Sequence, residues 1–156
     1  MAVLKRSRCL RQQKGAAAIE FALLFIIFFA LFYAIVSYSL AMLVMQGLNQ
    51  ASEEGVRAAV AVNPLAYSSV AAYSDKVELV ARERTASALS WLPTKAYQQV
   101  VGANHILVNV TGSVVTVTAT YPGYAANGLV PTLTLPLIGM VPRLPTDLVG
   151  AASLQI

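Results

Sequence analysis

The sequence predicts an α+β protein. A long N-terminal transmembrane helix continues as a stalk and leads into a small domain of one amphipathic helix against an antiparallel sheet of two or three strands. Three observations predict this fold. Residues 21–45 form an uncharged apolar run, residues 65–92 have a helical period, and the last third of the chain alternates as strands do. A length of 156 residues gives room for one domain.

The charge of the chain is distributed unevenly. Hydrophobic residues make up 57% of the sequence and charged residues 12%, a balance that indicates membrane contact rather than an ordinary soluble domain. The net charge is +4, and no acidic residue precedes Gly15, whereas five basic residues do: Lys5, Arg6, Arg8, Arg11 and Lys14. Only this short basic head could bind nucleic acid, and such binding needs a basic face on a folded body, so we expect no nucleic-acid partner.

The uncharged run 21–45 is long enough to span a membrane, since a hydrocarbon core about 30 Å thick takes roughly 20 helical residues. The basic cluster before the run should stay in the cytoplasm, which places the C-terminus outside. A cleaved secretory signal would have a shorter apolar core. We therefore expect a retained anchor that crosses the membrane once.

The helix should continue beyond the membrane as a stalk, because residues 46–62 are rich in good helix formers. A continuous helix over residues 16–62 would be on the order of 70 Å long, about twice what a bilayer needs. Asn63-Pro64 should end this helix, since proline disfavours helical backbone in the residue before it. Pro64 is also well placed to begin the next helix, with Asn63 as its cap.

The stalk contains a charged motif, 50-QASEEGVRAA-59. Glu53 and Arg57 are four residues apart in the favourable order for an ion pair, and Glu54 lies three residues from Arg57. Gly47 and Gly55 weaken the helix locally, so they mark either bends or close packing.

Residues 63–156 are predicted to form the small domain, beginning with a helix at 65–92. Glu78 and Arg82 are spaced for an ion pair on the solvent-exposed side of this helix, whereas Arg84 falls close to its apolar stripe. The stripe itself is predicted to contain Val70, Tyr73, Val77, Val80, Ala88 and Trp91.

Strands are predicted at 106–111 and 114–121, on either side of the turn residues Gly112-Ser113, and a third strand at the C-terminal DLVGAASLQI. A lone hairpin is only marginally stable, so the helix at 65–92 should cover one face of the sheet. The segment 122–145 holds five of the seven prolines, and its only charge is Arg143. It is either an irregular loop folded over the core or an apolar surface for a partner.

The N-terminal pattern resembles the type IV prepilin signal and, in detail, the TadE-like family of the tight-adherence (Tad, or Flp) pilus system. The resemblance rests on 14-KGAAAIEFAL-23 and 50-QASEEGVRAA-59, with a weaker contribution from the β-rich end and its Pro-rich loop. It implies that a prepilin peptidase cuts after Gly15, so that residues 1–15 are a basic leader and Ala16 becomes the new N-terminus. It also implies that Glu20 is the retained acid. Val56 stands where the family more usually has Ala.

The resemblance further implies a pilin-like fold and the function of a minor pilin or pseudopilin that acts in Tad pilus assembly and adhesion. The amine of Ala16 would meet the carboxylate of Glu20 in a neighbouring subunit, which makes Glu20, with Phe21 beside it, the predicted assembly site. The implied partners are the membrane, the prepilin peptidase, and other Tad pilins and pilus assembly proteins. The implied location is the bacterial inner (cytoplasmic) membrane, with the C-terminus periplasmic or extracellular, and the pilus itself.

Residues suited to catalysis are sparse. His105 is the only histidine and Cys9 the only cysteine, whereas a catalytic triad or a metal site needs several such groups. We therefore expect no enzyme activity, cofactor, metal or small-molecule substrate. Two alternatives to the pilin remain open: an uncleaved membrane-anchored scaffold of a secretion complex, and a membrane-anchored periplasmic enzyme or binding domain.

Overall fold

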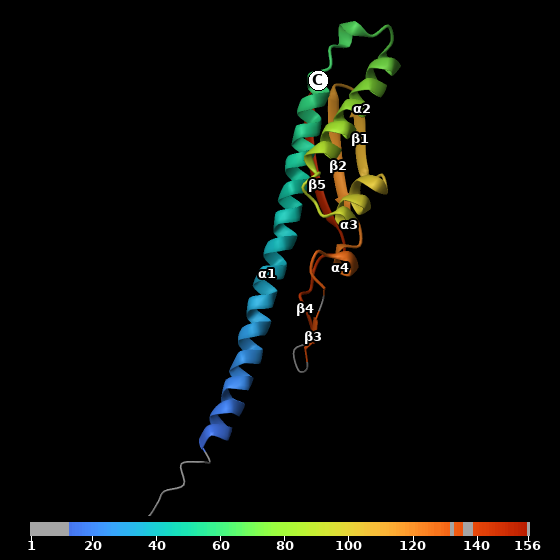
Figure 1. The fold of residues 1–156 in the computed structure, drawn as a ribbon. Helices are drawn as coiled ribbons and strands as arrows, with labels where there is room; N and C mark the ends of the chain where they lie inside the picture. The colour runs from blue at the N-terminus through green and yellow to red at the C-terminus, as the bar shows by residue number, and fades with distance from the viewer. Residues whose placement is uncertain (1–12, 132, 136–138, 156) are drawn as a thin grey trace, which may run out of the picture.

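The computed structural model describes residues 13–131, 133–135 and 139–155, which form one long helix and a small α+β domain packed along its far half (Figure 1). In chain order the elements are α1 (Gln13–Val60), a 3-10 helix η1 (Pro64–Ala66), α2 (Val70–Ala88), α3 (Thr94–Tyr97), a π-helix η2 (Gln98–Gly102), β1 (Ile106–Thr111), β2 (Val114–Tyr121), α4 (Tyr124–Asn127), β3 (Leu133–Leu135), β4 (Gly139–Val141) and β5 (Leu148–Gln155). The predicted α+β fold is confirmed.

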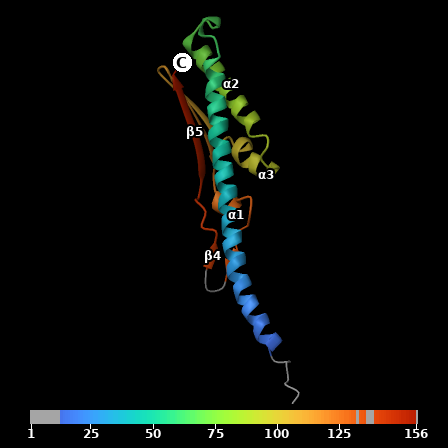
Figure 2. The same cartoon turned by 90° about the vertical axis from the view of Figure 1, so that its left-hand side faces the viewer.

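Helix α1 is continuous through the apolar run and the stalk, as predicted, and ends at Val60. By length and composition it could cross a membrane. Of its described side chains, from Gly15 onward, none is buried before Ala30. Beyond Ala30 one face is buried, for example at Ala41, Val44 and Leu48, which are three and four residues apart. The part of α1 before Ala30 therefore stands free of the domain, and the C-terminal half is part of its core (Figures 1 and 2).

The sheet has the strand order β1-β2-β5 and is antiparallel throughout. Thr111 pairs with Val114 across the Gly112-Ser113 turn, and Gly112 has φ 60°, a backbone conformation that glycine adopts at little cost. All three predicted strands are confirmed. The face toward the helices is buried, as the alternation requires, and its side chains are those of Ile106, Val115, Val117, Ala119, Tyr121 and Leu148.

Two helices cover this face of the sheet rather than one. Helix α1 packs against β5 and β2, and α2 packs against β1 and α1 (Figures 1 and 2). The prediction that the helix at 65–92 covers one face is therefore incomplete, because the stalk itself forms part of the domain core.

The predicted extent of that helix is wrong. Asn63 does cap a helix that begins at Pro64, but this is the short η1, and α2 starts separately at Val70. The Ser69 side chain caps α2 by accepting a hydrogen bond from the Ala72 amide at 3.2 Å.

The apolar stripe of α2 is also narrower than predicted. The buried positions are Val77, Ala81 and Thr85, whereas Val70 is 82% exposed and Trp91 is 47% exposed. Small side chains at Ala81 and Thr85 let α2 approach α1 closely, so a narrow strip of the helix suffices to make the contact.

In its described part, the Pro-rich segment contains the helix α4 and the strands β3 and β4, so it is not an irregular loop throughout. Tyr124 of α4 is buried, and its ring meets that of Tyr121 edge-on with centroids 5.1 Å apart. Strands β3 and β4 then form a separate hairpin, with Leu133 paired to Val141. The hairpin extends past the end of the three-stranded sheet, toward the N-terminal end of α1 (Figures 1 and 2).

Candidate functional site

The predicted cleavage junction lies in the first turn of α1. Gly15 and Ala16 are both helical and exposed, and among the described residues, apart from the chain neighbours of Gly15, no side chain lies within 4 Å of the position where a Gly15 Cβ would stand. Of the basic head, Lys14 lies in α1, whereas Lys5, Arg6, Arg8 and Arg11 fall outside the described residues. The junction is thus open on the helix surface, where an enzyme could reach it.

Glu20 lies one helical turn beyond Ala16 and is exposed. Four residues of helix correspond to a rise of about 6 Å. The side chains on either side of Glu20 are apolar and exposed, Ile19 at 66% and Phe21 at 69%. The acid therefore stands on an apolar surface, available to a group outside its own chain.

Phe21 is the first ring of an aromatic row along α1. Its ring stacks on that of Phe25 at 6.0 Å between centroids, and the row continues through Phe29 to Tyr33 with spacings of 6.0 and 6.2 Å. The i,i+4 spacing places all four rings on one helix face. The row thus runs from the predicted assembly site to the level of the β3–β4 hairpin, whose Pro131 carbonyl accepts a hydrogen bond from the Tyr33 hydroxyl.

The stalk motif presents two faces with different partners. Glu53 and Arg57 point to solvent and form the predicted ion pair, with 3.5 Å between the carboxylate and guanidinium. Glu54 does not join them. Its carboxylate pairs with Arg84 of α2 at 2.8 Å, which also explains why Arg84 falls beside the apolar stripe.

The buried face of the motif holds the domain against α1. Ala51, Ser52, Gly55, Val56 and Ala59 are all buried. A Cβ at Gly55 would overlap the Thr85 hydroxyl and lie 3.0 Å from the Ala81 carbonyl oxygen. Close packing, rather than a bend, is therefore the reason for Gly55.

Strand β5 docks on the same part of α1. The buried Ser52 hydroxyl donates to the Gly150 carbonyl at 3.1 Å, and the Ala151 amide donates to the Asn49 side-chain oxygen at 3.3 Å. Sequence reasoning did not identify Asn49, Ser52 or Gly150. Only the run of small residues in the C-terminal strand could have indicated a close approach there.

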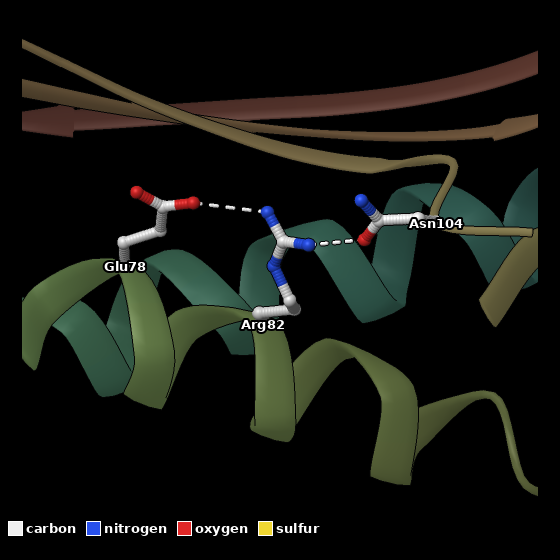
Figure 3. A network of polar contacts seen from close by, with 3 residues as sticks. All are labelled: Glu78, Arg82 and Asn104. Carbon is white, nitrogen blue, oxygen red and sulfur yellow. Dashed lines mark hydrogen bonds and ion pairs between the residues drawn. The ribbon is translucent and has the colours of Figure 1, made fainter. Parts of the chain in front are cut away.

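A second polar network joins α2 to the segment before β1 (Figure 3). The predicted pair of Glu78 and Arg82 is present at 2.9 Å, and Arg82 also donates to the side-chain oxygen of Asn104. Asn104 has φ 61°, a conformation that asparagine tolerates better than most residues. The network lies on the surface and fixes the turn into β1.

A hollow of about 750 Å³ lies between α3, η2 and the α4 region. Lys95 is the only charged residue among the described residues that line it. His105 is half-buried, and its main chain joins η2 to the sheet, with its amide donating to the Val100 carbonyl at 2.9 Å. Within the described ranges, no three His, Cys, Asp or Glu side chains are grouped so that they could hold a metal ion.

In a comparison with protein families, the model of the TadE-like protein family matches residues 15–57. The resemblance on which the sequence interpretation rests is thereby confirmed over that segment. The matched segment begins at the predicted junction and ends at Arg57 of the stalk motif. Neither the curated proteins nor the solved structures gave a match.

Proposed function

We propose that this chain, which matches the TadE-like family from Gly15 to Arg57, is a minor pilin or pseudopilin that acts in Tad pilus assembly and adhesion. The match itself indicates a protein associated with the Tad pilus. The observation that carries the finer proposal is the continuity of α1, which places the junction at Gly15, the acid Glu20 and the stalk motif on one helix.

Cleavage after Gly15 changes the electrostatics of the helix start. It removes the five basic side chains of the leader and leaves the α-amino group of Ala16, with the Glu20 carboxylate one turn away. Either charge alone is costly to bury in a bilayer, whereas a pair in a medium of low dielectric attracts strongly. A neighbouring subunit that is shifted along the axis would bring its amine to this carboxylate and neutralise both.

The packing of the domain links the contact at Glu20 to the position of the whole subunit along the axis. Because the domain is held on the far half of α1 through Gly55 and the Glu54–Arg84 pair, a contact made at Glu20 also determines where the domain lies. The small side chains of Ala16, Ala17 and Ala18 leave room for a second helix at the same level.

The proposed location is the bacterial inner membrane, with the basic head in the cytoplasm and the domain outside, and then the pilus. A reporter that is active only outside the cytoplasm, fused after Ile156, should be active. Activity of a reporter that works only in the cytoplasm would contradict this orientation.

The mass of the purified chain tests the processing step. We expect a mature N-terminus at Ala16 in the presence of the peptidase, and retention of the leader in Gly15→Leu, because the branched side chain fills the open junction. Ala22→Leu places the same leucine side chain seven residues further on and should be cut normally. An intact leader in the unaltered protein would contradict the pilin proposal and favour an uncleaved membrane-anchored scaffold of a secretion complex.

A further inference from the structure

The apolar hairpin, defined as β3, β4 and the flanking residues 129–131 and 142–145, lies against the apolar part of α1. The Tyr33 hydroxyl donates to the Pro131 carbonyl, and the Tyr38 hydroxyl donates to the Arg143 carbonyl at 3.1 Å. Between these two tyrosines the side chain of Ser37 is only 2% exposed. Both tyrosines belong to the uncharged run 21–45, so the hairpin contacts the helix within its membrane-spanning part.

The other face of the same helix turns is apolar and exposed. Leu31, Phe32 and Ile35 are 61%, 55% and 57% exposed. If the hydrocarbon begins at Phe21, a core about 30 Å thick ends near Leu40. Tyr33 then lies about 10 Å inside the boundary on the domain's side. The hairpin meets α1 at this level, so it occupies the same layer as these exposed apolar side chains.

We propose that the apolar hairpin is immersed in the membrane leaflet on the domain's side, with lipid acyl chains covering it. The inference rests on the proposed role of α1 as a membrane anchor. It assigns the hairpin to phospholipid rather than to a second protein, because the hairpin lies at the same level along α1 as the exposed apolar side chains of Leu31, Phe32 and Ile35.

The composition of the hairpin suits a lipid environment. The sequence 129-LVPTLTLPLIGMVP-142 carries no charge, and Leu133 and Leu135 lie in β3. Exposed backbone polar groups are costly in hydrocarbon. Here β3 and β4 pair with each other, and Pro131 and Pro142 have no N–H to satisfy. The hydroxyls of Tyr33 and Tyr38 donate to the carbonyls of Pro131 and Arg143, which lie outside the β3–β4 pairing.

Arg143 marks the level at which the hairpin leaves the hydrocarbon. It is exposed and is the first charged residue after the apolar stretch, and its carbonyl is bound by Tyr38, only about 3 Å below the expected boundary. Tyrosine and arginine are both suited to the interface, where the guanidinium can reach lipid phosphates.

Fluorescence quenching in vesicles tests this placement. Full-length Cys9→Ser protein is given a single cysteine by Leu133→Cys, labelled with an environment-sensitive fluorophore, and reconstituted in phosphatidylethanolamine and phosphatidylglycerol. Ile35→Cys serves as the control on the exposed face of α1, and Ser113→Cys as the control at the far end of the domain. The probes are compared for quenching by nitroxide groups on the acyl chains and by iodide in the water.

We expect the Leu133→Cys and Ile35→Cys probes to be quenched several-fold more by the acyl-chain nitroxide than the Ser113→Cys probe, and to be protected from iodide. Iodide quenching at Leu133→Cys with protection at Ile35→Cys would overturn the hairpin inference and leave the anchor intact. Exposure of both probes would overturn the anchor as well. Protection at Leu133→Cys without nitroxide quenching, lost when the protein is diluted in lipid, would show that a second copy covers the hairpin.

Discussion

Gly55 of α1 lies directly against the side chain of Thr85 of α2, so that only this small side chain separates the two helix backbones at this point. The Thr85 hydroxyl is buried and donates to the Ala81 carbonyl at 2.8 Å, within its own helix. The contact therefore depends on the missing Cβ of Gly55 rather than on a bond between the helices. It joins the stalk motif to the domain at the end of the segment that matches the family.

Gly55→Ala should destabilise the domain, although alanine is the better helix former by roughly 1 kcal/mol. The added methyl would overlap the Thr85 hydroxyl and crowd a backbone carbonyl, and overpacking of this kind costs about 1–3 kcal/mol. Urea unfolding in detergent micelles, followed by the fluorescence of Trp91, measures the change. Arg57→Ala, on the exposed face half a turn away, is the control. A Gly55→Ala protein as stable as the unaltered one would contradict the close approach.

Adding Thr85→Ala to Gly55→Ala should recover part of the loss, because it removes the side chain that the new methyl meets first. The recovery should stay incomplete, since the Ala81 carbonyl lies 3.0 Å from the added Cβ in either case. Strict additivity of the two substitutions would show that the residues are not in contact.

The ion pair between Glu54 and Arg84 should contribute about 0.5–1 kcal/mol, because Arg84 is 56% exposed and solvent screens the interaction. Glu54→Arg and Arg84→Glu should each destabilise the domain, and the double exchange should recover most of the loss. Glu53→Arg, which breaks only the exposed pair with Arg57, should cost less. Absence of coupling in this double-mutant cycle would show that Glu54 does not fasten the stalk to α2.

Sequence periodicity was sufficient to predict the long helix and the three-stranded sheet. Each of these elements is long enough to show its period, and the buried faces at Val115, Val117 and Ala119 follow the alternation. The pairs Glu53–Arg57 and Glu78–Arg82 were predictable for the same reason, since a helix alone brings residues four apart together.

The contacts between elements could not be predicted in this way. Glu54 and Arg84 are thirty residues apart, and their pairing depends on how α2 crosses α1. The strands β3 and β4 have three residues each, too few for an alternation to show, and they lie among prolines that suggest a loop. The role of the stalk as part of the core was missed because it depends on how the domain packs back onto α1, which is a contact between elements far apart in the sequence.

Alkaline pH should weaken the domain through Tyr121. Burial raises the pKa of the Tyr121 hydroxyl, and the neighbouring Tyr124 raises it further. The hydroxyl donates to the Asn127 carbonyl at 2.7 Å. The folded protein therefore holds this proton where the unfolded chain, with a pKa near 10.0, has released it, so stability falls as the pH rises above about 10.

Tyr121→Phe should lower stability at neutral pH by about 1 kcal/mol, since the Asn127 carbonyl loses a donor, but should make the alkaline decline shallower. Unfolding in urea at several pH values, with the Trp91 signal, compares the two proteins. An unchanged decline in Tyr121→Phe would show that another group is responsible.

The pairing of Glu20 with a neighbour's amine is the central claim, and partition of Glu20→Gln between the membrane and the sheared pilus fraction tests it most directly. The substitution keeps the size and hydrogen bonding of the side chain and removes its charge. We predict that Glu20→Gln is inserted and cut after Gly15 but is absent from the sheared fraction, whereas Glu53→Gln, an exposed acid on the same helix, is incorporated as the unaltered protein is. Incorporation of Glu20→Gln at the level of the unaltered protein, with normal piliation, would contradict the account.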